Sequence, residues 1–250
     1  MSLLTVARDL QRRKARERSG RFVAEGIRTV EELLRSALGI DGLLIAEEVV
    51  AQPRVAALLT VAETRGVPVL PVTEKEFESA AGTDAPQGVL AVASSPTWSF
   101  ASLPTGPLRL LILDALQDPG NVGTILRTAA AFDVSATIAL PGTVDLWNAK
   151  VVRSAMGSHF VHPTITSTAD ALAPFLRERG IPLWGADAAG TPIPEVTVPP
   201  QWALAVGNEG AGLSPATQPL VAMTVALPIS AAVESLNVAV ATGILLFALR

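Results

Sequence analysis

The alternation of strand-like and helix-like segments over residues 108–250 constrains the fold more than any other feature of this sequence. Short apolar runs alternate there with longer segments whose apolar residues recur at helical spacing. Strands that alternate with helices form a mostly parallel sheet with helices on both faces, so we predict an α/β domain. Strands are expected at 108–113, 135–140, 160–165, 182–185, 202–206 and 221–227, and helices at 121–132, 145–156, 168–179 and 234–249.

Three polar clusters lie where predicted strands end, at residues 121–127, 207–212 and 227–237. Loops at the carboxyl ends of parallel strands gather at one edge of a sheet, which is where ligands bind. We therefore expect the three clusters to form one composite site. Asn121 is also expected to cap the helix that it opens, and Arg127, six residues on, projects from a similar side of that helix.

The first part of the chain has the pattern of a smaller α/β unit. Helices are predicted at 26–38 and 53–64, and strands at 42–46, 67–72 and 87–93. The stretch that follows contains three prolines, a glycine and several Ser and Thr residues, a composition typical of linkers. We predict a first domain at 1–95, a linker at 96–107 and a second domain at 108–250.

Positive charge is concentrated at the N-terminus of a chain whose net charge is −4. Residues 1–28 contain eight Arg or Lys against three Asp or Glu, an excess of five positive charges, so the remaining residues sum to −9. A basic arm on an acidic body indicates a localised phosphate-binding surface, although a solvated helix face has the same composition. The candidate phosphate-binding residues are Arg8, Arg12, Arg13, Lys14, Arg16, Arg18 and Arg21.

The order and spacing of the three clusters resemble the SpoU (TrmH-type) RNA 2′-O-ribose methyltransferases of the SPOUT superfamily. The resemblance is tight over residues 108–250 and looser before them. It implies S-adenosylmethionine as the methyl donor, no metal, and a C-terminal trefoil knot, which no pattern in the sequence itself indicates. By resemblance, the catalytic residues are Asn121, Arg127, Glu209, Ser235 and Asn237, and the donor-binding residues are Gly207, Leu227, Ile229 and Leu236.

Two roles are open for Arg127 at this point. In the family, the matching arginine is proposed to receive the proton of the ribose 2′-hydroxyl. Arginine is a poor base, however, because its guanidinium group stays protonated in proteins. A bidentate contact with the neighbouring phosphate, which would stabilise the developing alkoxide, is an equally physical role.

The resemblance also implies partners. Residues 22–32 resemble the substrate-binding domain attached to many SpoU-like enzymes, so the first domain and its basic arm are expected to bind structured RNA through phosphate and shape contacts. A full N-terminal domain favours ribosomal RNA over transfer RNA as the substrate. The helix predicted at 234–249 is apolar on more faces than its own sheet would cover, which indicates a homodimer built on the second domain.

Composition excludes several kinds of site. The chain has no cysteine, which excludes disulfides, thiolate metal sites and thiol nucleophiles. His159 and His162 have no third metal ligand nearby in the sequence, so no metal site is expected. The longest apolar run is short for a membrane span, and we expect a cytoplasmic protein that does not associate with membranes.

Three alternative functions share some of these features. A nicotinamide dehydrogenase is disfavoured because the glycines at 207–212 do not have the spacing of the dinucleotide-binding fingerprint. A non-catalytic RNA-binding protein would be expected to lose Arg127, Glu209 or Asn237, and all three are present. A transfer-RNA methyltransferase would use the same chemistry and remains an alternative substrate assignment.

Overall fold

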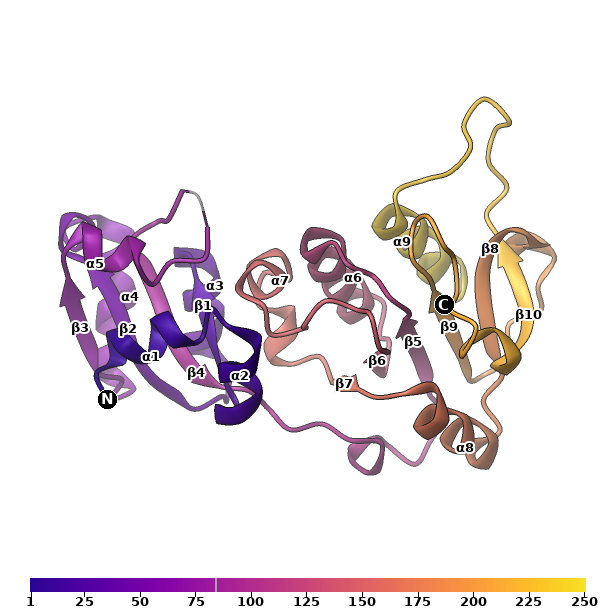
Figure 1. Ribbon diagram of the computed structural model, residues 1–250, viewed down its shortest axis with the longest axis horizontal. Helices are drawn as coiled ribbons and strands as arrows, with labels where there is room; N and C mark the ends of the chain where they lie inside the picture. The colour runs from indigo at the N-terminus through magenta and orange to yellow at the C-terminus, as the bar shows by residue number, and fades with distance from the viewer. Residues whose placement is uncertain (84) are drawn as a thin grey trace. The chain divides into compact units, whose positions relative to one another are not determined.

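The computed structural model describes residues 1–83 and 85–250, and these fold into two compact units (Figure 1). The first unit comprises residues 1–97 and 145–161, and the second comprises residues 98–144 and 162–250. Residues 145–161, which the sequence pattern assigns to the second domain, therefore pack with the first unit. The two units are covalently joined at three points of the chain.

The first unit contains strands β1 (Arg21–Glu25), β2 (Ile40–Ala46), β3 (Val69–Val72) and β4 (Val89–Ser94), and helices α1 (Leu3–Asp9), α2 (Arg13–Ser19), α3 (Ile27–Arg35), α4 (Pro53–Thr64), α5 (Glu74–Glu78) and α7 (Ala149–Ser154). Its sheet has the strand order β1-β4-β2-β3. β4 is antiparallel to β1 and β2, and β3 is parallel to β2. The small α/β unit is confirmed, although β1 and α5 were not predicted.

The side chains of β1 alternate between two cores. Phe22 and Ala24 pack with residues of α3 and α4, whereas Val23 packs with residues of α1 and α5 on the opposite face. The segment 145–161 contributes Val152 and Phe160, both buried, to the first of these cores. Burying a side chain of this size stabilises a fold by about 1.5–3 kcal/mol, so the segment is part of what holds the first unit together.

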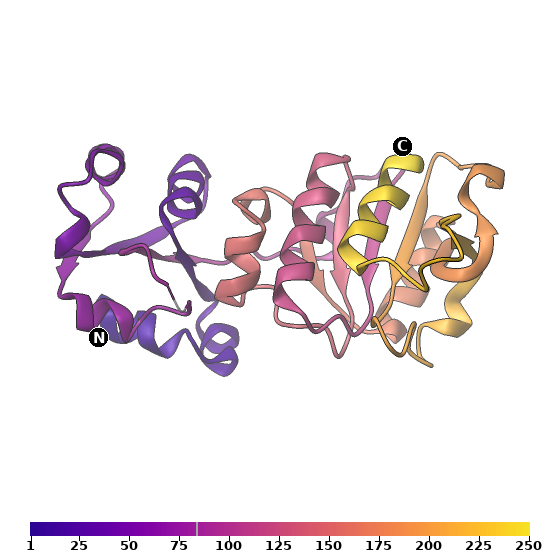
Figure 2. The same ribbon diagram turned by 90° about the horizontal axis from the view of Figure 1, so that it is seen from above.

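The second unit contains strands β5 (Arg109–Leu113), β6 (Ala136–Ala139), β7 (Thr164–Thr166), β8 (Leu183–Pro192), β9 (Trp202–Val206) and β10 (Val221–Ala226), and helices α6 (Pro119–Ala131), α8 (Ala169–Arg179) and α9 (Val238–Ala248). The strand order is β10-β8-β9-β5-β6-β7, and every neighbouring pair is parallel. α6 and α9 lie side by side on one face of the sheet, and α8 covers the other (Figures 1 and 2). The predicted α/β sheet with helices on both faces is confirmed.

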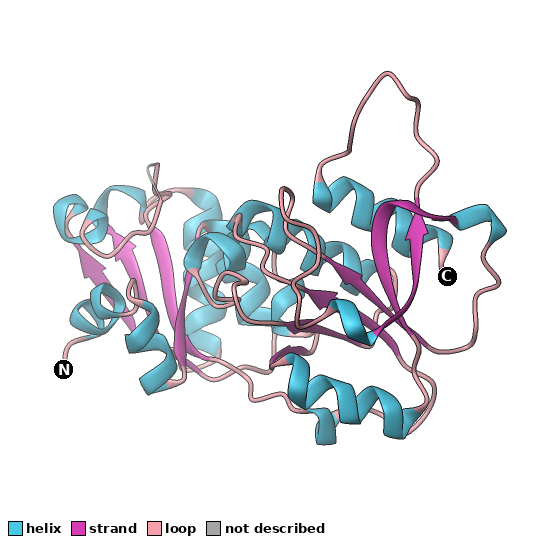
Figure 3. Ribbon diagram, turned by 45° about the vertical axis from the view of Figure 1, so that its right-hand side comes forward, coloured by secondary structure: helices cyan, strands magenta, loops and turns pink. Residues whose placement is uncertain are grey.

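Several predicted boundaries after residue 108 are wrong. The last helix begins at Val238 rather than at residue 234, because residues 227–237 form a long loop that stands out from the sheet (Figure 3). The helix predicted at 145–156 is reduced to α7. β8 continues to Pro192, beyond the predicted end at residue 185, because β10 pairs along its outer edge.

The strand order changes direction at β5. From β5 the chain adds β6 and β7 on one side, and then crosses back to place β9 and β8 on the other. Leu113 and Val206, the last residues of β5 and β9, are paired in register. The loops that follow these two strands therefore leave the sheet next to each other, at the type of switch point where open α/β sheets bind ligands.

Most of the predicted linker packs on the second unit. Trp98 and Phe100 lie against its hydrophobic core, and the ring of Phe100 stacks on that of Phe175 with centroids 4.4 Å apart. Arg179 further donates hydrogen bonds to the carbonyl oxygens of Pro104 and Gly106. The division between the two units thus falls at Thr97 and Trp98, at the start of the predicted linker.

Candidate active site

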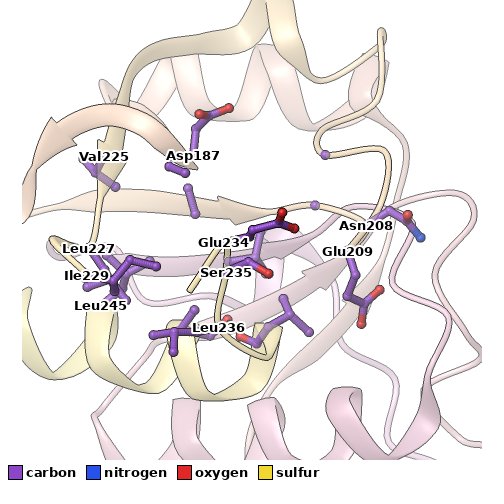
Figure 4. Close-up of a pocket in the computed structure, with 18 residues that line it drawn as sticks. Asp187, Asn208, Glu209, Val225, Leu227, Ile229, Glu234, Ser235, Leu236 and Leu245 are labelled. Atoms are coloured by element: carbon purple, nitrogen blue, oxygen red, sulfur yellow. Dashed lines mark hydrogen bonds between the residues drawn. The ribbon is translucent and has the colours of Figure 1, made fainter. Parts of the chain in front are cut away.

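A cavity of about 380 Å³ opens at the carboxyl edge of the second sheet, a size within the range of small-molecule sites (Figure 4). Its walls are residues 186–188 of β8, the loop 206–212 after β9, the loop 227–236 after β10, and one face of α9. Two of the three polar clusters therefore line it directly. The donor-binding residues predicted from sequence all lie in its wall, namely Gly207, Leu227, Ile229 and Leu236.

The side chain of Asn121 connects the three clusters. Its Nδ2 donates a hydrogen bond of 2.9 Å to Oε1 of Glu209, 88 residues away in the sequence. Its Oδ1 accepts a hydrogen bond of 3.0 Å from Nδ2 of Asn237, 116 residues away. The structure thus brings three of the five predicted catalytic residues into direct contact, and a fourth, Ser235, lines the adjacent cavity.

The helix caps leave the Asn121 side chain free for these contacts. α6 begins at Pro119 and its N-cap is Asp118, whose side chain accepts a hydrogen bond of 2.7 Å from the backbone N–H of Asn121. The prediction that Asn121 caps this helix is therefore wrong. Because a carboxylate three residues before it satisfies the helix terminus, the amide of Asn121 can point out of the first turn toward Glu209 and Asn237.

Asn237 performs two tasks at once. Its Oδ1 caps α9 by accepting hydrogen bonds from the backbone N–H groups of Ala239 and Val240. Its Nδ2 remains available and donates to Asn121. The helix cap thereby fixes the orientation of the amide that reaches the site, because a carboxamide held through its oxygen presents its nitrogen in a defined direction.

The loop after β9 follows a path that only glycine permits at its first position. A Cβ added to Gly207 would lie 2.3 Å from the carbonyl carbon of Gly212. The loop closes on itself through reciprocal backbone hydrogen bonds between Asn208 and Gly212. This close approach places backbone groups, rather than a side chain, at the wall of the cavity.

Asp114 was not singled out from the sequence, yet it positions that loop. It follows β5 directly, is 1% exposed, and accepts a hydrogen bond of 2.7 Å from the backbone N–H of Ser214. Nearby, Nδ2 of Asn208 donates to the carbonyl oxygen of Ala115. The end of β5 is therefore tied to both ends of the loop. The signal in the sequence that could have identified Asp114 is an acidic residue immediately after a buried strand.

Arg127 lies on an exposed position of α6 and does not line the cavity. Within the part of the chain that the structure describes, its side chain forms no hydrogen bond or ion pair. A single copy of the chain therefore does not bring Arg127 into contact with Asn121, Glu209 or Asn237. Its guanidinium group is available to a ligand or to another molecule.

The charged groups around the cavity are acidic. Asp187, Glu209 and Glu234 line it, and none of the described lining residues is Lys or Arg. Apolar side chains, among them Leu227, Ile229 and Leu245, form another part of the wall. Such a cavity suits a ligand that carries positive charge and also has a flat or apolar portion.

Comparison with known proteins identifies the family. Residues 109–247, more than half of the chain, match the model of the SpoU rRNA methylase family. The chain is also 35% identical over 242 residues to the 23S rRNA (guanosine(2553)-2′-O)-methyltransferase RlmP of Bacillus subtilis, covering 96% of this chain and 93% of that protein. The chain belongs to the SpoU rRNA methylase family. It is therefore an RNA methyltransferase, as the family resemblance of its sequence clusters implied.

Two solved methyltransferase structures have the same fold. The AdoMet-bound rRNA methyltransferase from Sinorhizobium meliloti is 29% identical with a TM-score of 0.84, covering 100% of this chain and 96% of that chain. The SpoU methyltransferase AviRb from Streptomyces viridochromogenes, in complex with AdoMet, is 25% identical with a TM-score of 0.89, covering 100% and 97%. Both structures contain the methyl donor that the sequence resemblance implied for this chain.

The first unit of this SpoU family member matches a domain model of its own. Residues 5–91 match the MRM3-like substrate binding domain. Of the seven basic residues predicted to bind RNA there, Lys14 and Arg18 are exposed and have no ion pair among the described residues, and Arg8 is bonded to the Ser79 hydroxyl. Surface carboxylates pair with three more, namely Arg12, Arg13 and Arg21.

Arg16 has a different role from the one expected. Its side chain is 7% exposed and forms an ion pair with Asp145, and it donates hydrogen bonds to the carbonyl oxygens of Leu10 and Gln11. A guanidinium group buried in this way cannot also reach a phosphate. The prediction that Arg16 binds RNA is therefore wrong.

The two histidines are buried and lie in different units. Nε2 of His162 is 2.8 Å from the Thr137 hydroxyl, and burial lowers the pKa of His162 to about 4. Among the residues described, no group of three or more His, Cys, Asp or Glu side chains is arranged to hold a metal ion. None of the described helices has the length and apolar character needed to cross a membrane.

Proposed function

We propose that this enzyme transfers the methyl group of S-adenosylmethionine to a ribose 2′-hydroxyl of ribosomal RNA. The observation that carries the proposal is the Asn121–Glu209–Asn237 cluster beside an acidic cavity, in a chain that is 35% identical to a 23S rRNA 2′-O-methyltransferase. A second relative, RlmB of Ralstonia nicotianae, also named a 23S rRNA 2′-O-methyltransferase, is 36% identical over 203 residues, covering 78% of this chain and 81% of that protein.

The cavity fits the methyl donor in shape and charge. S-adenosylmethionine combines a flat adenine with a sulfonium and an ammonium group, which outweigh its single carboxylate. Leu227, Ile229 and Leu245 offer an apolar wall, and the close approach at Gly207 offers backbone groups. When bound, the donor supplies a methyl group activated by its positive sulfur. The protein's contribution is therefore alignment and charge stabilisation, not activation of the methyl carbon.

Asn121, Glu209 and Asn237 are positioned to hold the acceptor ribose. Glu209 accepts a hydrogen bond from Asn121 and has a second oxygen that can accept one from a hydroxyl group. In the reaction, the 2′-oxygen forms a bond to the methyl carbon, and the carbon–sulfur bond breaks with its electron pair staying on the sulfur of S-adenosylhomocysteine. The hydroxyl proton passes to water. A preorganised set of amides and one carboxylate orients that hydroxyl before transfer. Ser235, in the cavity wall, assists at the same ribose.

We assign to Arg127 the neighbouring RNA phosphate rather than the proton. Its planar guanidinium group makes two parallel hydrogen bonds with a phosphate, and its charge stabilises the oxygen that loses its proton. Because Arg127 makes no contact with the site of its own described chain, the proposal includes a homodimer in which it serves the site of the other copy.

The dimer surface is supported by a stripe on α9. Val240, Ile244 and Phe247 are 52%, 45% and 57% exposed, and their spacing of four and three residues places them on one side of the helix. α6, which carries Arg127, packs against α9. A two-fold contact through this stripe would cover the apolar side chains and bring the α6 helices near the partner site.

A knotted C-terminus is also part of the proposal, on the strength of family membership. α9 contacts the short turn Ile193–Glu195, which lies in the connection between β8 and β9. Threading of the final helix through a loop formed by residues between β8 and β10 would produce such a contact. The general rules for how chains connect their helices and strands do not predict such threading.

The test is transfer of a tritium-labelled methyl group to RNA from cells that lack this gene. We expect label in the large ribosomal RNA, located at one ribose by mapping 2′-O-methylation. Asn121→Ala should abolish transfer, whereas Asp170→Asn, an exposed position on α8, should leave it unchanged. Label in transfer RNA alone would overturn the ribosomal assignment, and label on a base rather than a ribose would overturn the reaction.

A further inference from the structure

We propose that Asp187 binds the α-ammonium group of the methyl donor, and that it is the residue that selects donors carrying an amino-acid portion. The proposal rests on the donor site assigned above. It names one carboxylate among the three that line the cavity and gives it a ligand atom.

Asp187 reaches the cavity because β8 bulges at this point. β8 and β10 are paired at Gly185 and Thr224, but the next pair joins Thr191 to Val225. Residues 186–190 therefore have no partner in register and turn out of the sheet toward the cavity. Bulges of this kind redirect side chains next to active sites. The three residues 186–188 form one wall of the cavity.

The return of the bulge to the sheet depends on another glycine. A Cβ added to Gly190 would lie 2.7 Å from the carbonyl carbon of Thr224 and from the nitrogen of Val225. The backbone of the bulge therefore runs in direct contact with β10. A side chain at this position would push the bulge outward, so the sequence holds Asp187 at a defined distance from the neighbouring strand.

The carboxylate of Asp187 is oriented before any ligand binds. Its Oδ1 accepts a hydrogen bond of 2.8 Å from the backbone N–H of Ala189, two residues on. The other oxygen is left to accept from a ligand, and Asp187 is an exposed residue that lines the cavity. A charge that is already oriented loses little conformational freedom on binding, which strengthens its contact with a cation.

The two other carboxylates are less suited to the ammonium group. Glu209 is hydrogen-bonded to Asn121 and belongs to the end of the cavity where the ribose is held. Glu234 lies in the loop 227–237, on a different element from the bulge. Figure 4 shows Asp187 separated from Glu209 and from the apolar group of Leu227 and Leu245. Asp187 therefore lies apart from the apolar side chains proposed to contact adenine and apart from Glu209, where the ribose is held.

The chemistry of the donor requires such a group. Its α-ammonium group carries three hydrogen-bond donors and a full charge, and leaving them unpaired in a partly closed site is costly. Among the described lining residues, the acidic side chains are the charged acceptors available to it. Loss of one charge-assisted hydrogen bond of this type corresponds to about a tenfold loss of affinity.

The test uses calorimetry to compare the binding of two probes in which the sulfur atom carries no charge. S-adenosylhomocysteine keeps the amino-acid portion, whereas 5′-methylthioadenosine lacks it. Asp187→Asn removes the charge but keeps an oxygen that can accept from Ala189, so the bulge is retained. We expect Asp187→Asn to weaken S-adenosylhomocysteine about tenfold and 5′-methylthioadenosine by less than about twofold. Asp170→Asn, on the surface of α8, serves as the control, and thermal unfolding verifies that each variant is folded.

The outcomes separate the two proposals. If both probes weaken equally in Asp187→Asn, or neither weakens, the assignment of the ammonium group is overturned. If Glu234→Gln produces the selective loss instead, the ammonium group belongs to that residue and Asp187 is excluded. If the wild-type protein binds neither probe, the failure lies with the proposed donor site itself, and the inference falls with it.

Discussion

Arg16 and Asp145, 129 residues apart in the sequence, form an ion pair with an N–O distance of 2.6 Å, in which Arg16 is buried and Asp145 is half-buried. Arg16 belongs to the basic arm, and Asp145 opens the segment 145–161 that leaves the catalytic sheet and returns to it. Two further contacts repeat this connection within the first unit. The rings of Phe22 and Trp147 lie 4.5 Å apart, and Arg153 is 3.8 Å from the buried carboxylate of Glu25.

We expect either partner's removal from this pair to destabilise the protein. Asp145→Asn should lower the free energy of unfolding by about 3–5 kcal/mol, because Arg16 is left buried without its counter-charge. Arg16→Leu should lower it by less, because Asp145 is only half-buried. The double variant should lose less than the sum. Urea denaturation measures this. Arg13→Ala is the matched control, since its pair with Glu17 is more than half exposed and should contribute under about 1 kcal/mol. Weaker RNA binding by Arg16→Leu without loss of stability would contradict the structural role.

We expect the two units to remain associated after the chain is cut at their boundary. A protease site inserted between Thr97 and Trp98 should yield fragments that elute together on size exclusion, because 145–161 stays embedded in the core of the first unit. In the variant Val152→Asp, a charge is placed in that core and the cut fragments should separate. Separation of the fragments in the unmodified background would show that the segment does not hold the first unit.

Replacement of Gly207 should disable donor binding without unfolding the protein. The Cβ of Gly207→Ala would meet backbone atoms of Gly212 at 2.3–2.4 Å, so the loop must move. We expect the affinity for S-adenosylhomocysteine to fall by at least about tenfold, equivalent to about 1.4 kcal/mol. Gly106→Ala, where an added Cβ meets nothing within 4 Å, should bind normally. Calorimetry measures the affinity of each variant for S-adenosylhomocysteine. Equal affinity in the two variants would contradict the requirement for glycine at position 207.

The protein should lose stability in mild acid through His162. Its pKa is about 4 in the folded protein, below the value of 6.5 expected when unfolded, so the unfolded state binds the extra proton between these values. Stability from this group is complete above about pH 6.5 and declines as the pH falls toward 4, by about 1.4 kcal/mol per unit. Urea denaturation between pH 7 and about pH 5 should show a loss of about 2 kcal/mol that is absent in His162→Gln. An identical decline in the variant would exclude His162 as the cause.

A mixing experiment tests whether Arg127 acts in the other copy of a dimer. Arg127→Ala and Glu209→Gln should each be inactive alone. If Arg127 completes the partner's site, subunit exchange between the two variants should restore activity, because some mixed dimers carry one intact site. Mixing with a third variant, Arg127→Ala together with Glu209→Gln, supplies the control. No recovery after demonstrated exchange would contradict action across the dimer, and a stable, active monomer would contradict the dimer itself.

Local patterns in the sequence were sufficient for the second sheet and for the three clusters. β5, β9 and β10 were predicted with every end correct to within one residue. For β5 and β9 the reason is that buried parallel strands are continuous apolar runs. The exact helix starts were not predictable, since Asp118 and Asn121, or Ser235 and Asn237, are equally good caps by residue type. The choice between them depends on which side chain has a second partner far away in the sequence.

The sequence by itself determined most of the helices and strands and which polar residues stand at their ends, because period and capping are properties of neighbouring residues. Tertiary structure alone decided that Asn121 touches both Glu209 and Asn237, that Arg16 is buried against Asp145, and that the segment 145–161 belongs to the first unit. Each of these depends on the strand order and on pairings across about a hundred residues. A basic side chain has the same local signature whether it meets solvent or a buried carboxylate, so only the folded chain distinguishes the two.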